Sequence, residues 1–186
     1  MEEVSDEDIA KKAQDGDTES FGILVDRYEM KILRYARKFL LDSQEAEDCV
    51  QEVFIKSYVN IRSFDAKRKF SSWLYRIAHN EFINAIKKKS KSPLGFFDME
   101  EFFPNIPSKE RADDKINEKE IKDMLEKCLG AINPKYREVL ILYYIEGFDY
   151  KTIADILRVP VSTVSARIRR GKMSAKKQCE KQQFSL

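Results

Sequence analysis

Hydrophobic and polar residues alternate with helical periodicity along most of this chain. From about residue 18 to residue 40, apolar side chains recur every three or four positions, at Phe21, Leu24, Val25, Tyr28 and Ile32. This spacing places them on one face of an α-helix. No stretch alternates with a period of two for long enough to propose a sheet, and glycine is scarce. The pattern therefore predicts an all-α fold.

Capping residues give approximate boundaries for the other helices of the first half. Ser5, with Asp8 three residues later, is typical of a helix start. Asp42 or Ser43 caps a third helix, whose predicted buried stripe is Ala46, Cys49, Val50, Val53, Phe54 and Tyr58. After the loop "RSFDAKRK", a fourth helix runs from about Phe70 to Lys89, with a core stripe of Leu74, Ala78, Phe82 and Ala85.

Helical periodicity fails in the segment "SKSPLGFFDMEEFFPNIPSKERADD". Its prolines, glycine and mixed charge predict a flexible linker over residues 90–114. The linker would separate two small helical domains, residues 1–89 and 115–186. Its phenylalanines are costly to leave in water, and either this chain or a partner could cover them.

The second half is predicted to restart with a helix from about Ile116 to Leu129. In "NPKYREVLILYYIEG", Asn133 is the expected cap, Pro134 suits the first turn and Gly147 suits the stop. Asp149 then caps a short helix that carries Ile153, Ala154, Ile156 and Leu157.

A break at "RVP" separates that short helix from another that starts near Val161. Two short helices joined by a tight turn form the unit that inserts its second helix into the DNA major groove. At about 100° per residue, the predicted packing face of the second helix holds Val161, Val164, Ile168 and Gly171. The other side is small, polar and cationic: Ser162, Thr163, Ser165, Ala166, Arg169, Arg170 and Lys172.

Small residues allow a helix backbone to approach base edges, and arginine reaches guanine edges or phosphates. The second helix is therefore predicted to bind duplex DNA. The alternative is a solvated basic helix in a bundle.

The fourth helix carries a second candidate DNA surface, opposite its core stripe. That face holds Trp73, Arg76, Asn80, Asn84 and Lys87, and the preceding loop adds Phe64, Lys67, Arg68 and Lys69. An aromatic plane, amides and cations together suit an unpaired base and its phosphates. The alternative is that Trp73 buries its ring against the loop. His79, the only histidine, has no assigned role.

An acidic stripe marks the third helix. Glu45, Asp48 and Glu52 are three and four residues apart, with Gln51 at their side. Either solvent surrounds this stripe or a basic partner compensates it. A divalent-metal site is less favoured, because no histidine or second carboxylate set accompanies it.

Charge and composition narrow the function classes. The net charge of +2 hides an acidic first segment and basic segments over residues 62–91 and 158–181. The cysteines lack metal or disulfide spacing, so reduced thiols are expected. No apolar run approaches the roughly 20 residues of a membrane span. No Walker loop, zinc motif or catalytic triad appears. We expect a cytoplasmic protein without direct membrane insertion, cofactor or metal.

Three segments, in order, resemble bacterial sigma factors of the extracytoplasmic-function type (group IV of the sigma-70 family). "AEDCVQEVFIKSY" is similar to their region 2.2, "FSSWLYRIAHN" to regions 2.3 and 2.4, and "YKTIADILRVPVSTVSARIRRGK" to region 4.2. The resemblance covers nearly the whole chain. It implies a subunit that binds core RNA polymerase and directs promoter recognition, promoter melting and transcription initiation, with no enzymatic activity of its own.

The resemblance also implies a role for each surface. The helix with Glu45, Asp48, Gln51 and Glu52 would dock on the β′ clamp helices. The face with Trp73 would bind the minus-ten element as separated strands. The C-terminal domain would read the minus-thirty-five element as duplex and touch the β flap. An anti-sigma factor is a further partner expected from the family.

Two positions depart from the family pattern. Asn84 and Lys87 stand where many members have Asp and Arg, so no base preference is carried over. Two other functions remain open from the residues themselves. A helix-turn-helix regulator would bind duplex DNA without polymerase, and a nuclease would use the acidic helix with magnesium.

Overall fold

A computed structural model describes residues 4–89 and 128–183 of the 186-residue chain, with side chains as far as residue 178. Within these ranges every regular element is helical, as the periodicity predicts. The predicted linker over residues 90–114, and nearly all of the predicted helix from Ile116 to Leu129, lie outside the described residues.

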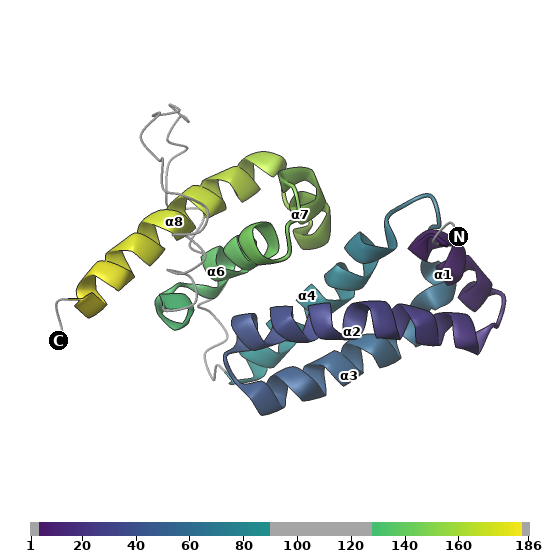
Figure 1. Cartoon of the computed structure of the whole chain (residues 1–186). Helices are drawn as coiled ribbons and strands as arrows, with labels where there is room; N and C mark the ends of the chain where they lie inside the picture. The colour runs from purple at the N-terminus through teal and green to yellow at the C-terminus, as the bar shows by residue number, and fades with distance from the viewer. Residues whose placement is uncertain (1–3, 90–127, 184–186) are drawn as a thin grey trace.

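The first half is a bundle of four helices: α1 (Asp6–Gln14), α2 (Thr18–Leu40), α3 (Ser43–Asn60) and α4 (Phe70–Lys89). The long helix α2 packs on the other three, and α3 also packs on α4 (Figure 1). Their aromatic side chains fill the core. The ring of Tyr35 lies 5.0 Å from Phe82 and 5.6 Å from Tyr75, centroid to centroid. A short 3-10 turn, Ile61–Ser63, follows α3.

The caps predicted from the sequence are present. The Ser5 hydroxyl accepts a hydrogen bond from the Asp8 amide, 3.1 Å away. Asp42, rather than Ser43, caps α3, because its carboxylate accepts from the Glu45 amide at 3.1 Å. This hydrogen bond from Glu45 and the nearby Lys89 lower the pKa of Asp42.

The predicted stripe of α3 is correct except at its last position. Ala46, Val50 and Val53 are buried, and Cys49 and Phe54 are half-buried. Tyr58, predicted in the core, is 46% exposed, with its ring edge against Phe21. Ser57 is buried instead, because it lies closer to the centre of the packed face and its hydroxyl donates to the Val53 carbonyl.

The second half contains α6 (Pro134–Leu140), a π-helical segment (Ile141–Ile145), α7 (Tyr150–Leu157) and α8 (Val161–Gln183). Asn133 caps α6, Pro134 lies in its first turn, and Gly147 ends the segment with φ 76°, all as predicted. The Asp149 cap is also confirmed, and Arg158 makes the turn before α8 in the left-handed region.

The packing face of α8 holds Val164, Ile168 and Gly171, as predicted. Val161 was expected on this face but is 47% exposed, because it is the first residue of the helix and precedes the contact with α6. Arg167, which the periodicity did not single out, is buried.

At Gly171, α8 lies close against α6. A Cβ there would lie 2.9 Å from Leu140 Cδ1, and Leu140 is fully buried. We expect Gly171→Ala to lower stability, because overpacking costs roughly 1–3 kcal/mol. Gly22→Ala is the matched control: a Cβ meets nothing within 4 Å, so it should gain about 0.5–1 kcal/mol. Urea unfolding of both variants measures the change in stability, and equal effects of the two substitutions would contradict the prediction.

The two halves are packed against each other, which the sequence did not predict. Helix α7 lies on α4, and α6 with the π-helical segment lies on α2 (Figure 1). The rings of Tyr75 and Phe148 meet edge to face at 4.7 Å across this contact. We call this contact the interdomain seam.

Cysteine pairing differs in part from the expectation of reduced thiols. Cys128 is disulfide-bonded in this structure, whereas Cys49 is free. Separately, none of the helices that the structure describes combines the length and the apolar character that crossing a membrane requires.

Candidate nucleic-acid and polymerase interfaces

The outer face of α4 carries the predicted side chains for unpaired DNA. Asn80, Asn84 and Lys87 are exposed, and Trp73 and Arg76 are half-buried. Lys67, Arg68 and Lys69, in the loop before α4, are also exposed. The helix therefore places a row of amides and cations on one side of the bundle, next to an aromatic ring.

Phe64 does not belong to this face, contrary to the prediction. It is only 4% exposed, and its ring packs 5.5 Å from Phe70 and 5.4 Å from Trp73, centroid to centroid. Phe64 therefore packs against Trp73 as a largely buried residue. Trp73 is packed on one side and open on the other, because part of its ring packs on Phe64 and Phe70 while the rest borders solvent.

Two hollows flank Trp73. The first, of about 290 Å³, is lined by Lys56, Asn60, Ser63, Trp73, Arg76, Ile77, Asn80, Glu81 and Arg158. The second, of about 370 Å³, lies on the loop side and is lined by Ser63, Phe64, Asp65, Arg68, Lys69, Trp73, Arg76, Asp155 and Arg158. Each hollow thus combines the tryptophan with cations and polar side chains, which suits a base and its phosphate.

Sequence reasoning missed the contribution of α3 to the first hollow. Lys56 and Asn60 are one turn apart near the end of α3, and Lys56 Nζ lies 2.5 Å from Glu81 on α4. The hydrogen bond to Glu81 raises the pKa of Lys56. The spacing of Lys56 and Asn60 was readable from the sequence, but their position beside Asn80 depends on how α3 packs on α4.

Residues of α7 also reach the predicted DNA face. Arg76 Nη2 lies 2.7 Å from Asp155 Oδ1, and Arg76 Nε donates to the Asp155 carbonyl at 3.2 Å. Arg68 lies 3.8 Å from the same carboxylate. The two arginines that were predicted on this face therefore lie within ion-pair distance of one carboxylate in the second half of the chain.

The acidic stripe of α3 forms an exposed surface. Asp48, Gln51 and Glu52 are exposed, and the same side of the helix continues with Ile55, 56% exposed, and Val59, 73% exposed. The prediction missed these two apolar residues, although their spacing from Asp48 and Glu52 was a usable signal. We call Asp48, Gln51, Glu52, Ile55 and Val59 the α3 face.

Glu45 lies at the edge of this surface. Its side chain is 20% exposed and forms an ion pair of 2.6 Å with Lys89 of α4. The hydrogen bond to Glu45 raises the pKa of Lys89.

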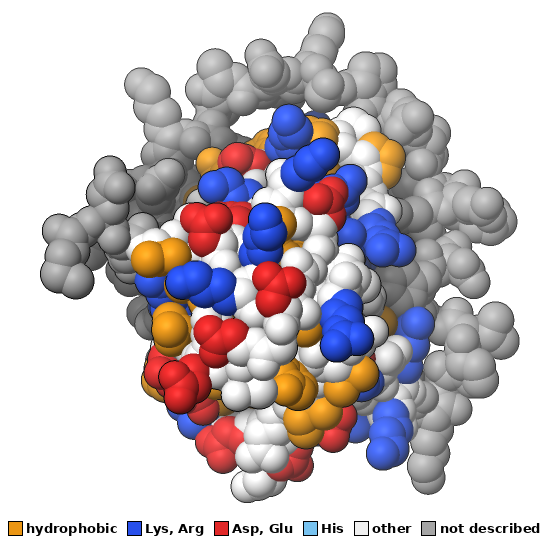
Figure 2. Space-filling model, turned by 90° about the vertical axis from the view of Figure 1, so that its right-hand side faces the viewer, with side chains coloured by type: hydrophobic (Ala, Val, Ile, Leu, Met, Phe, Trp, Pro, Cys, Tyr) orange, Lys and Arg blue, Asp and Glu red, His pale blue; other side chains and the backbone are white. Residues whose placement is uncertain are grey.

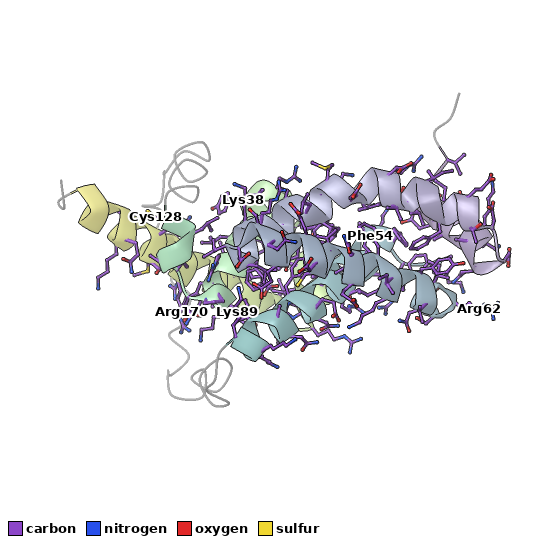
Figure 3. The ribbon with its side chains drawn as sticks, turned by 90° about the horizontal axis from the view of Figure 1, so that it is seen from below. Lys38, Phe54, Arg62, Lys89, Cys128 and Arg170 are labelled. Carbon is purple, nitrogen blue, oxygen red and sulfur yellow. The ribbon has the colours of Figure 1, made fainter. Side chains whose placement is uncertain are left out.

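Lys89 lies far along the bundle from Arg62, which follows α3 (Figure 3). The end of the molecule nearest α1 shows both signs of charge among apolar patches (Figure 2).

The side of α8 that was predicted to bind DNA is exposed or half-buried. Ser162, Ser165 and Arg169 are exposed, and Thr163, Ala166, Arg170 and Lys172 are half-buried. They lie away from the face that packs on α6. Small side chains thus occupy the first turns, with cations farther along.

No three His, Cys, Asp or Glu side chains within the described ranges are grouped to hold a metal ion.

Both halves of the chain match known protein families. The family "Sigma-70 region 2" matches residues 24–92, and "Sigma-70, region 4" matches residues 122–174. An "ECF RNA polymerase sigma factor SigW" from Bacillus subtilis is 37% identical over 176 residues, which cover 90% of this chain and 93% of that protein. The "RNA polymerase sigma-H factor" of Pseudomonas aeruginosa is 32% identical, covering 92% of each.

Solved structures show the same fold. CnrH, solved in complex with the cytosolic domain of CnrY, gives a TM-score of 0.68 at 23% identity and covers 94% of this chain and 97% of that chain. The sigma factor RpoE from Bartonella quintana, solved with the anti-sigma factor NepR, gives 0.64 at 22% identity, covering 86% of this chain and 96% of that chain.

Proposed function

This chain belongs to the extracytoplasmic-function sigma factors of the sigma-70 family, and from that premise we propose which of its surfaces bind polymerase and promoter DNA. As a sigma factor it directs promoter recognition in transcription initiation and has no enzymatic activity of its own. Its partners are core RNA polymerase and promoter DNA, and it acts in the cytoplasm.

The face of α4 binds the minus-ten element after the strands separate. The observation that carries this proposal is the position of Trp73 between two hollows lined by amides and cations. Taking a base out of the stack costs a few kcal/mol, so a protein that holds melted DNA needs aromatic and polar partners ready for it. Lys56 and Asn60 join Trp73, Arg76, Asn80, Asn84 and Lys87 in this role.

Helix α8 reads the minus-thirty-five element in the major groove. Its exposed Ser162 and Ser165 let the backbone come close to base edges, and Arg169 reaches guanine or phosphate. The α3 face binds the β′ clamp helices, and the first helices of the second half contact the β flap. An anti-sigma factor completes the set of partners that family membership supports.

Transcription with purified core polymerase tests the proposal. Core enzyme plus this protein should start transcription at defined sites within a library of genomic promoters, and start-site mapping then gives the element sequences. A plain helix-turn-helix regulator would bind the same fragments as duplex and start nothing. If none of the fragments supports initiation, the proposed roles of these surfaces are refuted.

Arg169→Ala should relax discrimination at the minus-thirty-five element. A good bidentate pair between arginine and guanine contributes about 1–3 kcal/mol of discrimination against the wrong base. Lys176→Ala, an exposed cation farther along α8, is the matched control. It should weaken binding to all sequences alike and reduce the slope of affinity against salt by about one. Competition binding with wild-type and substituted duplexes separates the two effects, and unchanged discrimination in Arg169→Ala would remove it from the base-reading set.

A further inference from the structure

Helix α1 packs beside the loop that precedes α4 and carries several of the proposed minus-ten residues. It lies against the 3-10 turn Ile61–Ser63 and against α4 itself (Figure 1). The match to the Sigma-70 region 2 family begins at residue 24, after the end of α1. The family match therefore leaves α1 without a role, and its contacts with the loop indicate one.

The side chain of Gln14, the last residue of α1, holds the main chain of this loop. Its Nε2 donates to the Ile61 carbonyl at 2.9 Å and to the Phe64 carbonyl at 2.7 Å. A primary amide has two N–H groups, so one side chain satisfies both carbonyls. Gln14 is half-buried, and hydrogen bonds away from bulk water are stronger than those in it. The start of the loop is thus tied to one point on α1.

These hydrogen bonds reach Trp73 through Phe64. The ring of Phe64 is 4% exposed and packs 5.4 Å from the ring of Trp73, centroid to centroid. By holding the Phe64 main chain, Gln14 determines where that ring meets the tryptophan. The cationic residues 67–69 follow in the same loop, so the hydrogen bonds also fix the point from which they extend.

Glu7 holds the other end of the loop. Its Oε1 accepts from the amide of Phe70, the first residue of α4, at 3.0 Å. A carboxylate is favourable here, because the first amides of a helix lack partners within the helix and carry partial positive charge. The Phe70 ring lies 5.6 Å from Trp73, so Glu7 and Gln14 support the tryptophan through both ends of the loop.

Helix α1 is itself anchored to the bundle. Ile9, Ala10 and Ala13 are buried, and the Asp6 carboxylate accepts from the Tyr28 hydroxyl at 2.5 Å. Because α1 is fixed in this way, hydrogen bonds from its last turn restrain the loop relative to the core of the first half.

We infer that Gln14 and Glu7 are positioning residues for promoter opening. They hold the loop over residues 61–69 and, through Phe64 and Phe70, keep the Trp73 ring in the orientation that receives an unpaired base. The inference rests on the proposed function of the α4 face, and both residues act without touching DNA. A loop that is ordered beforehand loses less entropy on binding, so this support increases affinity for the separated strand.

Gln14→Met tests the inference, because it keeps the length of the side chain and removes both donors. The full-length variant is assayed with a labelled single-stranded oligonucleotide that carries the non-template minus-ten sequence of a mapped promoter. Affinity should fall about tenfold if the loop is in place in about 10% of the variant molecules, because apparent affinity scales with that fraction. Affinity for the duplex minus-thirty-five element should not change. Gln44→Met, the same substitution at an exposed position of α3, is the matched control and should bind as the wild type does.

The fluorescence of Trp73 provides a second readout that a general loss of stability would not change in the folded protein. Trp73 is the only tryptophan in the chain, so acrylamide quenching without denaturant reports its exposure alone. Gln14→Met and Glu7→Ala should both raise the quenching constant. Glu7→Gln keeps an acceptor oxygen for the Phe70 amide and should leave the constant unchanged. Urea unfolding verifies that each variant is folded under these conditions.

Wild-type affinity for the oligonucleotide in both Gln14→Met and Glu7→Ala would overturn the inference, as would equal losses for the oligonucleotide and the duplex. Trp73→Ala distinguishes these results from failure of the proposed function. If Trp73→Ala loses oligonucleotide binding while the two α1 variants keep it, the minus-ten assignment stands and the inference is refuted. If Trp73→Ala binds the oligonucleotide as the wild type does, both are refuted.

Discussion

Trp73→Ala should reduce open-complex formation about 5- to 150-fold while leaving binding to the duplex minus-thirty-five element unchanged. Stacking of a base on an aromatic side chain contributes roughly 1–3 kcal/mol, which corresponds to this range. Trp73 borders both hollows on the α4 face, and it is the only tryptophan in the chain. Heparin-resistant complexes on a mapped promoter measure the open state, and gel-shift titration measures duplex binding.

Trp73 also packs on Phe64 and Phe70, so a stability control is required. Trp73→Phe retains an aromatic plane and should recover most of the open-complex yield, whereas Trp73→Ala should not. Urea unfolding of both variants shows how much of the loss comes from the packing of the ring. Equal losses in open-complex formation and duplex binding would mean that Trp73 is only a core residue.

Asp48→Arg should weaken binding to core RNA polymerase by more than 100-fold. Helix α3 presents Asp48 and Glu52 to solvent beside the exposed Ile55. A basic partner surface facing them would meet a like charge in the variant, and such juxtaposition costs several kcal/mol. Native gels or fluorescence anisotropy with core enzyme give the dissociation constant directly.

Asp15→Arg is the matched control, because it makes the same change of charge at an exposed position after α1. It should bind core enzyme as the wild type does. Ile55→Ser separates the apolar part of the α3 face from its charge, since burying an isoleucine contributes about 1.5–3 kcal/mol. Wild-type affinity in both Asp48→Arg and Ile55→Ser would exclude the α3 face as the polymerase-binding surface.

Most of the secondary structure was predictable because its determinants are local. The Asp42 and Asn133 caps each bond to amides two or three residues away, and Gly147 ends its segment through its own φ. The bounds of α4, Phe70–Lys89, match the prediction. Because such features depend only on residues close by in the chain, they can be predicted from the sequence.

The errors fall where burial depends on distant segments. Phe64 was expected to face DNA, but it is buried against Phe70 and Trp73, and Gln14 of the distant α1 donates a hydrogen bond to its carbonyl. Tyr58 and Val161 were expected in the core, but Tyr58 lies at the edge of the packed face of α3, and Val161 is the first residue of α8. Helical periodicity gives the direction of a side chain, and only the packed neighbour decides whether anything covers it.

By itself, the sequence determined the helices, their caps, the helix-turn-helix and the family, because each is written in residues close together along the chain. The tertiary structure alone decided the interdomain seam. Arg34 and Glu146 are 112 residues apart, and Arg76 and Asp155 are 79 apart. No periodicity links such positions, since their pairing follows from how the surfaces of the two halves fit together, and that fit also decides how much of the α4 face is exposed.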